Sequence, residues 1–72
     1  MIELLRSNDA VLISFADALL NEAGIAHAVV DQNMSVMEGS LGILPRRMLV
    51  ARDRHENARR IMIEAGLERE LS

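Results

Sequence analysis

Apolar residues recur at helical spacing in two stretches of the chain. In the first stretch, they lie three or four residues apart and so share one face of a helix: Leu12, Phe15, Ala16, Leu19, Leu20 and Ala23. The pair Asn8 and Asp9 suits the start of this helix, and Gly24 suits its C-terminal cap. The pattern predicts a helix over residues 9–23.

The second stretch repeats the pattern near the C-terminus with Ala58, Ile61, Met62 and Ala65. Asp53 is a candidate N-cap, and Gly66 would close this helix. Met48 and Met62 are expected in the core. The tail LERELS would add either a short edge strand or another helical turn.

Three short apolar segments predict strands at residues 2–7 (IELLRS), 25–31 (IAHAVVD) and 43–51 (ILPRRMLVA). Pro45 cannot donate to a ladder, so it should lie near the start of its strand or on an edge. The order β-α-β-β-α, with a short final β as an option, is the split βαβ arrangement. We therefore expect one α+β domain over residues 1–72, with a ferredoxin-like antiparallel sheet and two helices on one face.

The predicted strands are apolar on both faces. In residues 43–51, Leu44, Met48 and Val50 lie opposite to Ile43 and Leu49, whereas a sheet with one solvated face alternates more cleanly. A chain of 72 residues is near the lower limit for a self-sufficient core, and it has no cysteine for disulfides. A second copy of the chain is therefore expected to cover the other face, as a homo-oligomer.

Charge and hydropathy exclude some classes of partner. The net charge is −3, which argues against nucleic-acid binding. No apolar run approaches the length of a membrane span, and no signal peptide precedes the domain, so we expect a soluble, cytoplasmic protein. All eight basic residues are arginine. This choice reflects either bidentate recognition of anions or the codon bias of a GC-rich genome.

The segment 31–47, DQNMSVMEGSLGILPRR, is long, lacks clear periodicity and contains two glycines and the only proline. Such segments often bind ligands. Arg46 or Arg47 could hold an anion together with backbone N–H groups near the glycines, although adjacent strand residues leave on opposite faces. The alternative is a structural salt bridge beside ordinary turn glycines. The candidate ligand-binding residues are Asp31, Gln32, Ser35, Glu38, Gly39, Ser40, Gly42, Arg46 and Arg47.

Signatures of metal binding and catalysis are missing from the sequence. His27 and His55 lie on separate predicted elements and form no HxxxH or HExxH motif. No nucleophile elbow, Walker loop or dinucleotide fingerprint occurs, and no motif joins Ser35 or Ser40 to a histidine. We therefore predict no catalytic site, no metal and no cofactor.

Two motifs together resemble a known family: a strand that ends in R-[ST]-N-[DE], and the later run D-Q-x-M-S-x-x-E-G-S-x-G-x-L-P-R-R. The family is a small bacterial domain of unknown function, described as "putative prokaryotic signal-transducing proteins". It is placed among ferredoxin-like folds related to the nitrogen-regulatory PII proteins, which form oligomers and bind small ligands between subunits. The resemblance implies this fold and self-association, and a role in signalling.

The leading hypothesis is a non-enzymatic regulatory domain that self-associates and binds a small anionic ligand or a protein partner through residues 31–47. The alternative is a structural oligomerisation module, in which this segment only builds the subunit interface. A small enzyme is the third reading, because the sequence displays no positioned acid–base pair.

Overall fold

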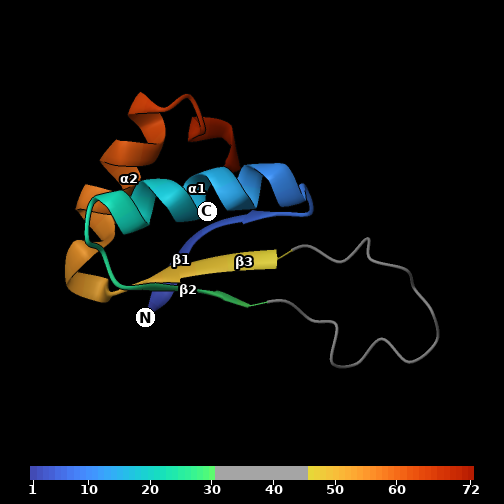
Figure 1. The fold of residues 1–72 in the computed structure, drawn as a ribbon. Coiled ribbons are helices and arrows are strands. Elements are labelled where there is room, and N and C mark those ends of the chain that lie inside the picture. The colour runs from blue at the N-terminus through green and yellow to red at the C-terminus, as the bar shows by residue number, and fades with distance from the viewer. Residues whose placement is uncertain (31–45) are drawn as a thin grey trace.

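The computed structural model describes residues 1–30 and 46–72. The described elements, in chain order, are β1 (Ile2–Ser7), α1 (Ala10–Glu22), β2 (His27–Val30), β3 (Arg46–Val50), the 3-10 turn η2 (Arg52–Arg54), α2 (His55–Glu64) and the 3-10 turn η3 (Glu68–Glu70) (Figure 1). The predicted α+β class and the β-α-β-β-α order are confirmed.

The three described strands form one antiparallel sheet in the order β1-β3-β2. Because β3 lies in the centre, β1 and β2 run parallel to each other on its two sides. On the outer edge of β1, Leu71 forms an antiparallel bridge with Leu5. This position is that of the fourth strand in a ferredoxin-like sheet, so the tail forms both the helical turn and a minimal edge contact.

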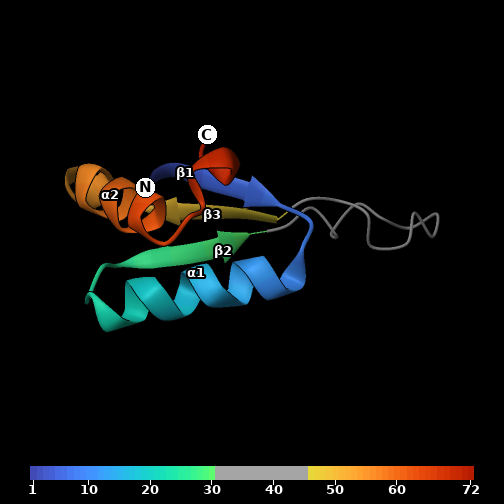
Figure 2. The same ribbon diagram turned by 90° about the horizontal axis from the view of Figure 1, so that it is seen from above.

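Both helices pack on the same face of the sheet (Figures 1 and 2). The core between the two layers consists of buried side chains from the helices, the strands and the segment before β2: Leu4, Leu5, Ile13, Ala16, Leu20, Ile25, Met48, Val50, Ala58 and Met62. Met48 and Met62 are fully buried, as the sequence predicted. Burial of this apolar surface is the main stabilising contribution to a domain of this size.

The predicted stripe of α1 is confirmed at four positions, because Ala16 and Leu20 are buried and Leu12 and Leu19 pack against the core. It was wrong at Phe15, which is 46% exposed, and at Ala23, which is exposed, and it omitted the buried Ile13. Helical spacing alone allows either Phe15 or Ile13 on the buried face of α1. The position of the helix on the sheet determines that Ile13 is the buried residue.

Capping explains where the helices begin and end. The Asp9 carboxylate accepts hydrogen bonds from the N–H groups of Val11 (2.9 Å) and Leu12 (3.3 Å), which confirms the expected start of α1. Gly24 and Gly66 follow the two helices with φ of 70° and 86°, as expected of glycine caps. Asp53 is not the N-cap of α2, because it lies within η2 and α2 begins only at His55.

His27 links β2 to α1 through two hydrogen bonds. Its Nδ1 lies 2.8 Å from the carbonyl oxygen of Ile25, and its Nε2 lies 2.6 Å from Oδ1 of Asp17. The side chain of His27 is only 8% exposed. Burial lowers the pKa of His27, but the hydrogen bonds to Ile25 and Asp17 outweigh it, so the net shift of the pKa is upward. The protonated ring donates to both acceptors, whereas a neutral ring can donate to only one.

This arrangement predicts a pH-dependent stability. The folded-state pKa of His27 is raised, so the protonated ring stabilises the folded state. This contribution to the free energy of unfolding is fully present below the unfolded pKa of about 6.5, and it is lost as pH rises through the folded pKa. Asp17→Asn should lower the free energy of unfolding by about 1 kcal/mol at about pH 6 and flatten the pH dependence. Urea denaturation followed by circular dichroism measures both effects.

The exposed Asp53→Asn variant is the matched control, because it removes the same charge outside this contact. An unchanged pH dependence in Asp17→Asn would contradict the assignment.

Candidate functional site

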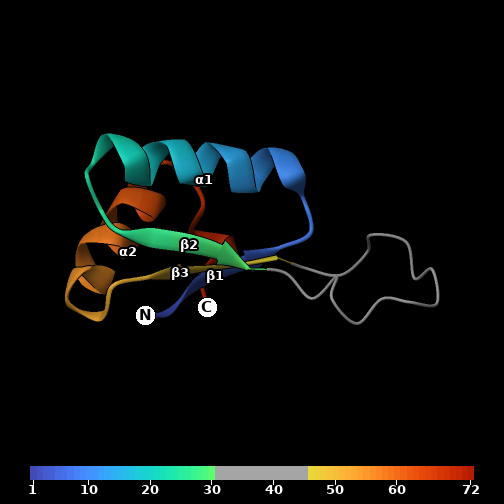
Figure 3. The same ribbon diagram turned by 60° about the horizontal axis from the view of Figure 1, so that its bottom comes forward.

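The sheet has a second face, and no helix of the described residues covers it (Figure 3). Side chains alternate along β3, so Met48 and Val50, both fully buried, point toward the helices together with Arg46. Arg47 and Leu49 therefore point to the uncovered face. The prediction that the two adjacent arginines leave on opposite faces is confirmed.

A β-bulge in β1 adds charged residues to this face. Glu3 lies opposite Leu49 and Leu5 lies opposite Met48, so Leu4 is an extra residue in β1. In a regular strand, residues three apart face opposite sides of the sheet. The bulge instead buries both Leu4 and Leu5 and places Glu3 and Arg6 together on the uncovered face.

Strand register completes this surface, which we call the open face. Arg6 lies opposite Arg47, and Arg47 in turn lies opposite Val30 of β2. Leu49 lies between Glu3 and Ala28 in the same way. The open face is therefore charged toward β1 and apolar toward β2, and consists of Glu3, Arg6, Ala28, Val30, Arg47 and Leu49.

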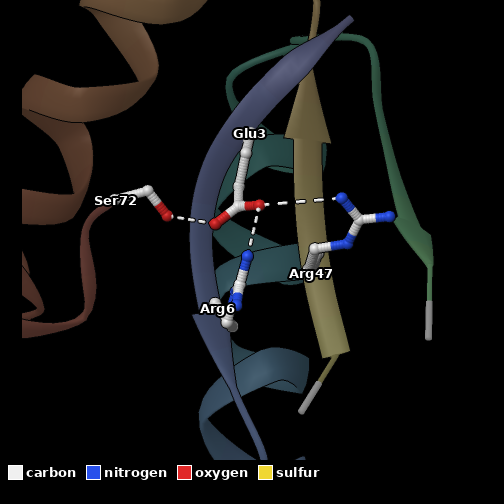
Figure 4. Close-up of polar contacts among 4 residues, drawn as sticks. All are labelled: Glu3, Arg6, Arg47 and Ser72. Atoms are coloured by element: carbon white, nitrogen blue, oxygen red, sulfur yellow. Dashed lines mark hydrogen bonds and ion pairs between the residues drawn. The ribbon is translucent and has the colours of Figure 1, made fainter. Parts of the chain in front are cut away.

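Glu3 is the centre of the charged half (Figure 4). Its Oε1 accepts a hydrogen bond from Nη2 of Arg6 at 3.3 Å and lies 3.8 Å from Nη1 of Arg47. Its other oxygen, Oε2, accepts a hydrogen bond from the Ser72 hydroxyl. The backbone N–H of Ser72 donates to the carbonyl oxygen of Leu4 at 2.9 Å. The same residue of the tail is thus bound to β1 through its side chain and its backbone.

The charged side chains of this cluster do not balance. Two arginines share one carboxylate, so the side chains of Glu3, Arg6 and Arg47 together carry a net charge of +1. The contact between Arg47 and Glu3 is too long for a hydrogen bond, and the Nε of Arg47 is buried without a hydrogen-bond partner among the described residues. A guanidinium group has five N–H donors, and of the nitrogens of these two arginines Glu3 contacts only Nη2 of Arg6 and Nη1 of Arg47.

Glu3 should titrate below the usual range of glutamate. The hydrogen bond from Ser72, followed by that from Arg6, lowers the pKa of Glu3. Its stabilising contribution is present above the ordinary pKa of about 4.3 and is lost as pH falls through the lower folded pKa. Carboxyl NMR should detect this shift, and Ser72→Ala should move the pKa back toward its usual value. An unaltered pKa in that variant would show that the hydroxyl contact is not formed.

Most residues of the predicted site lie outside the described residues: Asp31, Gln32, Ser35, Glu38, Gly39, Ser40 and Gly42. Their joint role with Arg47 stays a prediction. Within the described residues, the carboxylate beside Arg47 is Glu3, which the sequence did not suggest. Arg6 and Ser72 were missed as well, because the long-range pairing of β1 with β3 and with the tail brings these groups together around Glu3. The bulge in β1 cannot be read from the spacing of IELLRS.

Other kinds of site have less support in the described part of the chain. In residues 1–30 and 46–72, no group of three or more His, Asp or Glu side chains could hold a metal ion. Among the same residues, no helix has the length and apolar character needed to cross a membrane. His27 is bound by Asp17 and Ile25, so its ring is occupied in the fold.

Comparison with known proteins identifies a family. Residues 1–66 match the model of a family described as "Putative prokaryotic signal transducing protein". This match spans every described strand and both α-helices. The search of curated proteins found no match.

Proposed function

The chain belongs to the family described as "Putative prokaryotic signal transducing protein", whose model matches residues 1–66, and we propose that it is a non-enzymatic regulatory domain of the cytoplasm. It acts as a homo-oligomer and binds a small anionic ligand or a protein partner. The observation that carries this proposal is the open face, which presents apolar side chains next to a cross-strand pair of arginines.

The apolar half of the open face supports self-association. Ala28, Val30 and Leu49 are neighbours across β2 and β3, and no described helix covers them. Further burial of apolar surface stabilises a domain whose own core is small. A twofold contact would place this patch against its copy, as is common in symmetric dimers.

Charge placed within this patch should weaken the oligomer. We expect Ala28→Lys and Leu49→Lys to shift the mass measured by light scattering toward the monomer, because a lysine buried at the contact loses its hydration. Val11→Lys is the matched control, since Val11 is 77% exposed on α1. Circular dichroism checks that each variant is folded. A wild-type protein that stays monomeric at high concentration would contradict self-association.

The charged half supports binding of an anion. Arg6 and Arg47 are side by side in register, and a guanidinium group matches carboxylate and phosphate geometry. The polar residues of 31–47 are proposed to add contacts to the same ligand. In the sequence, this segment follows Val30, the last residue of β2, and it ends with the first two residues of β3.

Thermal unfolding tests whether the protein binds an anion. Phosphate or a dicarboxylate at about ten times its Kd should stabilise by about 1.4 kcal/mol and raise the Tm by roughly 5–10 °C. Arg47→Ala and Arg6→Ala should abolish most of this rise. Arg46→Ala, on the opposite face, and the exposed Arg60→Ala should retain it.

The results distinguish the ligand-binding domain from the structural oligomerisation module. If no anion raises the Tm of the wild type, the ligand part of the proposal fails. If Arg47→Ala and Arg6→Ala instead disrupt the oligomer in the absence of ligand, the cluster builds the subunit interface and the structural module is correct.

The non-enzymatic role is supported by the placement of the acid–base candidates. His27 and Asp17 form a hydrogen-bonded pair, but the side chain of His27 is only 8% exposed and both of its nitrogens are in contact with protein acceptors. A general base must reach a proton on the substrate. Turnover of any screened substrate would contradict this part of the proposal.

A further inference from the structure

Glu3 occupies the position that the anionic group of a ligand would take on the open face. Its carboxylate lies next to Arg6, Arg47 and the Ser72 hydroxyl, and the side chain is only 21% exposed. These partners are donors, and the two arginines are positively charged. They are the groups that protein sites use to bind carboxylates and phosphates. The chain therefore carries its own occupant of the site (Figure 4).

We propose that Glu3 is an internal competitor whose displacement by a carboxylate or phosphate group releases the C-terminal Leu71 and Ser72 from β1. This inference rests on the anion binding proposed above and adds its regulation. The ligand takes the donors of Arg6 and Arg47, and the Glu3 side chain turns toward solvent.

The geometry of the ion pairs makes Glu3 displaceable. Arg6 holds its carboxylate at 3.3 Å, near the outer limit of a hydrogen bond, and Arg47 approaches only to 3.8 Å. A monovalent carboxylate leaves one positive charge of the arginine pair unbalanced. A ligand with two negative charges, oriented by two guanidinium groups, neutralises the pair more completely.

The tail responds because Glu3 is one of its attachments. The Ser72 hydroxyl donates to Glu3, while the Ser72 N–H donates to Leu4 and Leu71 bridges Leu5. Loss of the first contact leaves the backbone pairing of Ser72 with Leu4 and of Leu71 with Leu5. Release would uncover the outer edge of β1, whose backbone groups then become available for new pairing. Ligand binding would thus alter a surface on the opposite side of β1 from Arg47.

Affinity measurements test the competition. Glu3→Gln keeps the shape of the side chain and removes its charge, so inorganic phosphate and succinate should bind about two- to fivefold more tightly by calorimetry. Glu64→Gln removes one exposed charge from α2 and is the matched control, with affinity expected to stay near that of the wild type. An affinity of Glu3→Gln equal to that of the control overturns the competition.

NMR of the wild-type chain tests the release. Saturation with phosphate or succinate should lower the heteronuclear NOE of the Leu71 and Ser72 amides and speed their hydrogen exchange. In Arg47→Ala, these signals should not respond to the same additions. Glu3→Gln alone, without ligand, should already loosen Ser72, because the neutral amide accepts a weaker hydrogen bond than a carboxylate.

The two proposals fail in different ways. If anions raise the Tm through Arg47 but the tail amides do not change, the site stands and the release is wrong. If neither phosphate nor succinate binds to any variant, the internal competitor and the anion part of the proposed function fail together.

Discussion

The extra residue in β1 is the constraint on which both faces of the sheet depend. With Leu4 inserted between Glu3 and Leu5, two consecutive leucines enter the core while Glu3 and Arg6 both reach the open face. Without the bulge, a regular alternation would direct either Glu3 or Arg6 into the apolar core, where an unpaired charge is costly. The bulge that buries both leucines therefore also places Glu3 and Arg6 on the open face. A change that removed the bulge would alter the core and the charged cluster together.

The central position of β3 extends this coupling across the sheet. Met48 and Val50 fill the core, and the residues between and beside them alternate to the open face. Since β3 pairs with both neighbours, its register aligns Arg47 with Arg6 on one side and with Val30 on the other. A shift of one residue would reverse the faces and bury the arginine, so the core determines the register and the register determines the site.

The sequence predicted the element order, both glycine caps and the start of α1, because these depend on local spacing and local hydrogen bonds. It chose Phe15 instead of Ile13 for the buried face of α1, because both fit helical spacing and only contact with the sheet decides. It also could not predict that Glu3 meets Arg6, Arg47 and Ser72. Those residues are brought together by long-range pairing and by a bulge, and nothing in their spacing marks either. The assignment of Arg47 to one face and Arg46 to the other did follow from the sequence, since alternation is a local property.

The domain divides its polar contacts between two roles. His27 and Asp17 join α1 to β2 at short distances, with a nearly buried ring that satisfies two acceptors. Such a contact resists exchange with a ligand, because any replacement must reproduce both hydrogen bonds. The ion pairs of Glu3 with Arg6 and Arg47 have the opposite character, because their contacts are longer and both guanidinium groups are partly exposed. A small domain can lose the second set of contacts without losing its core, because none of the side chains of Glu3, Arg6 and Arg47 belongs to that core.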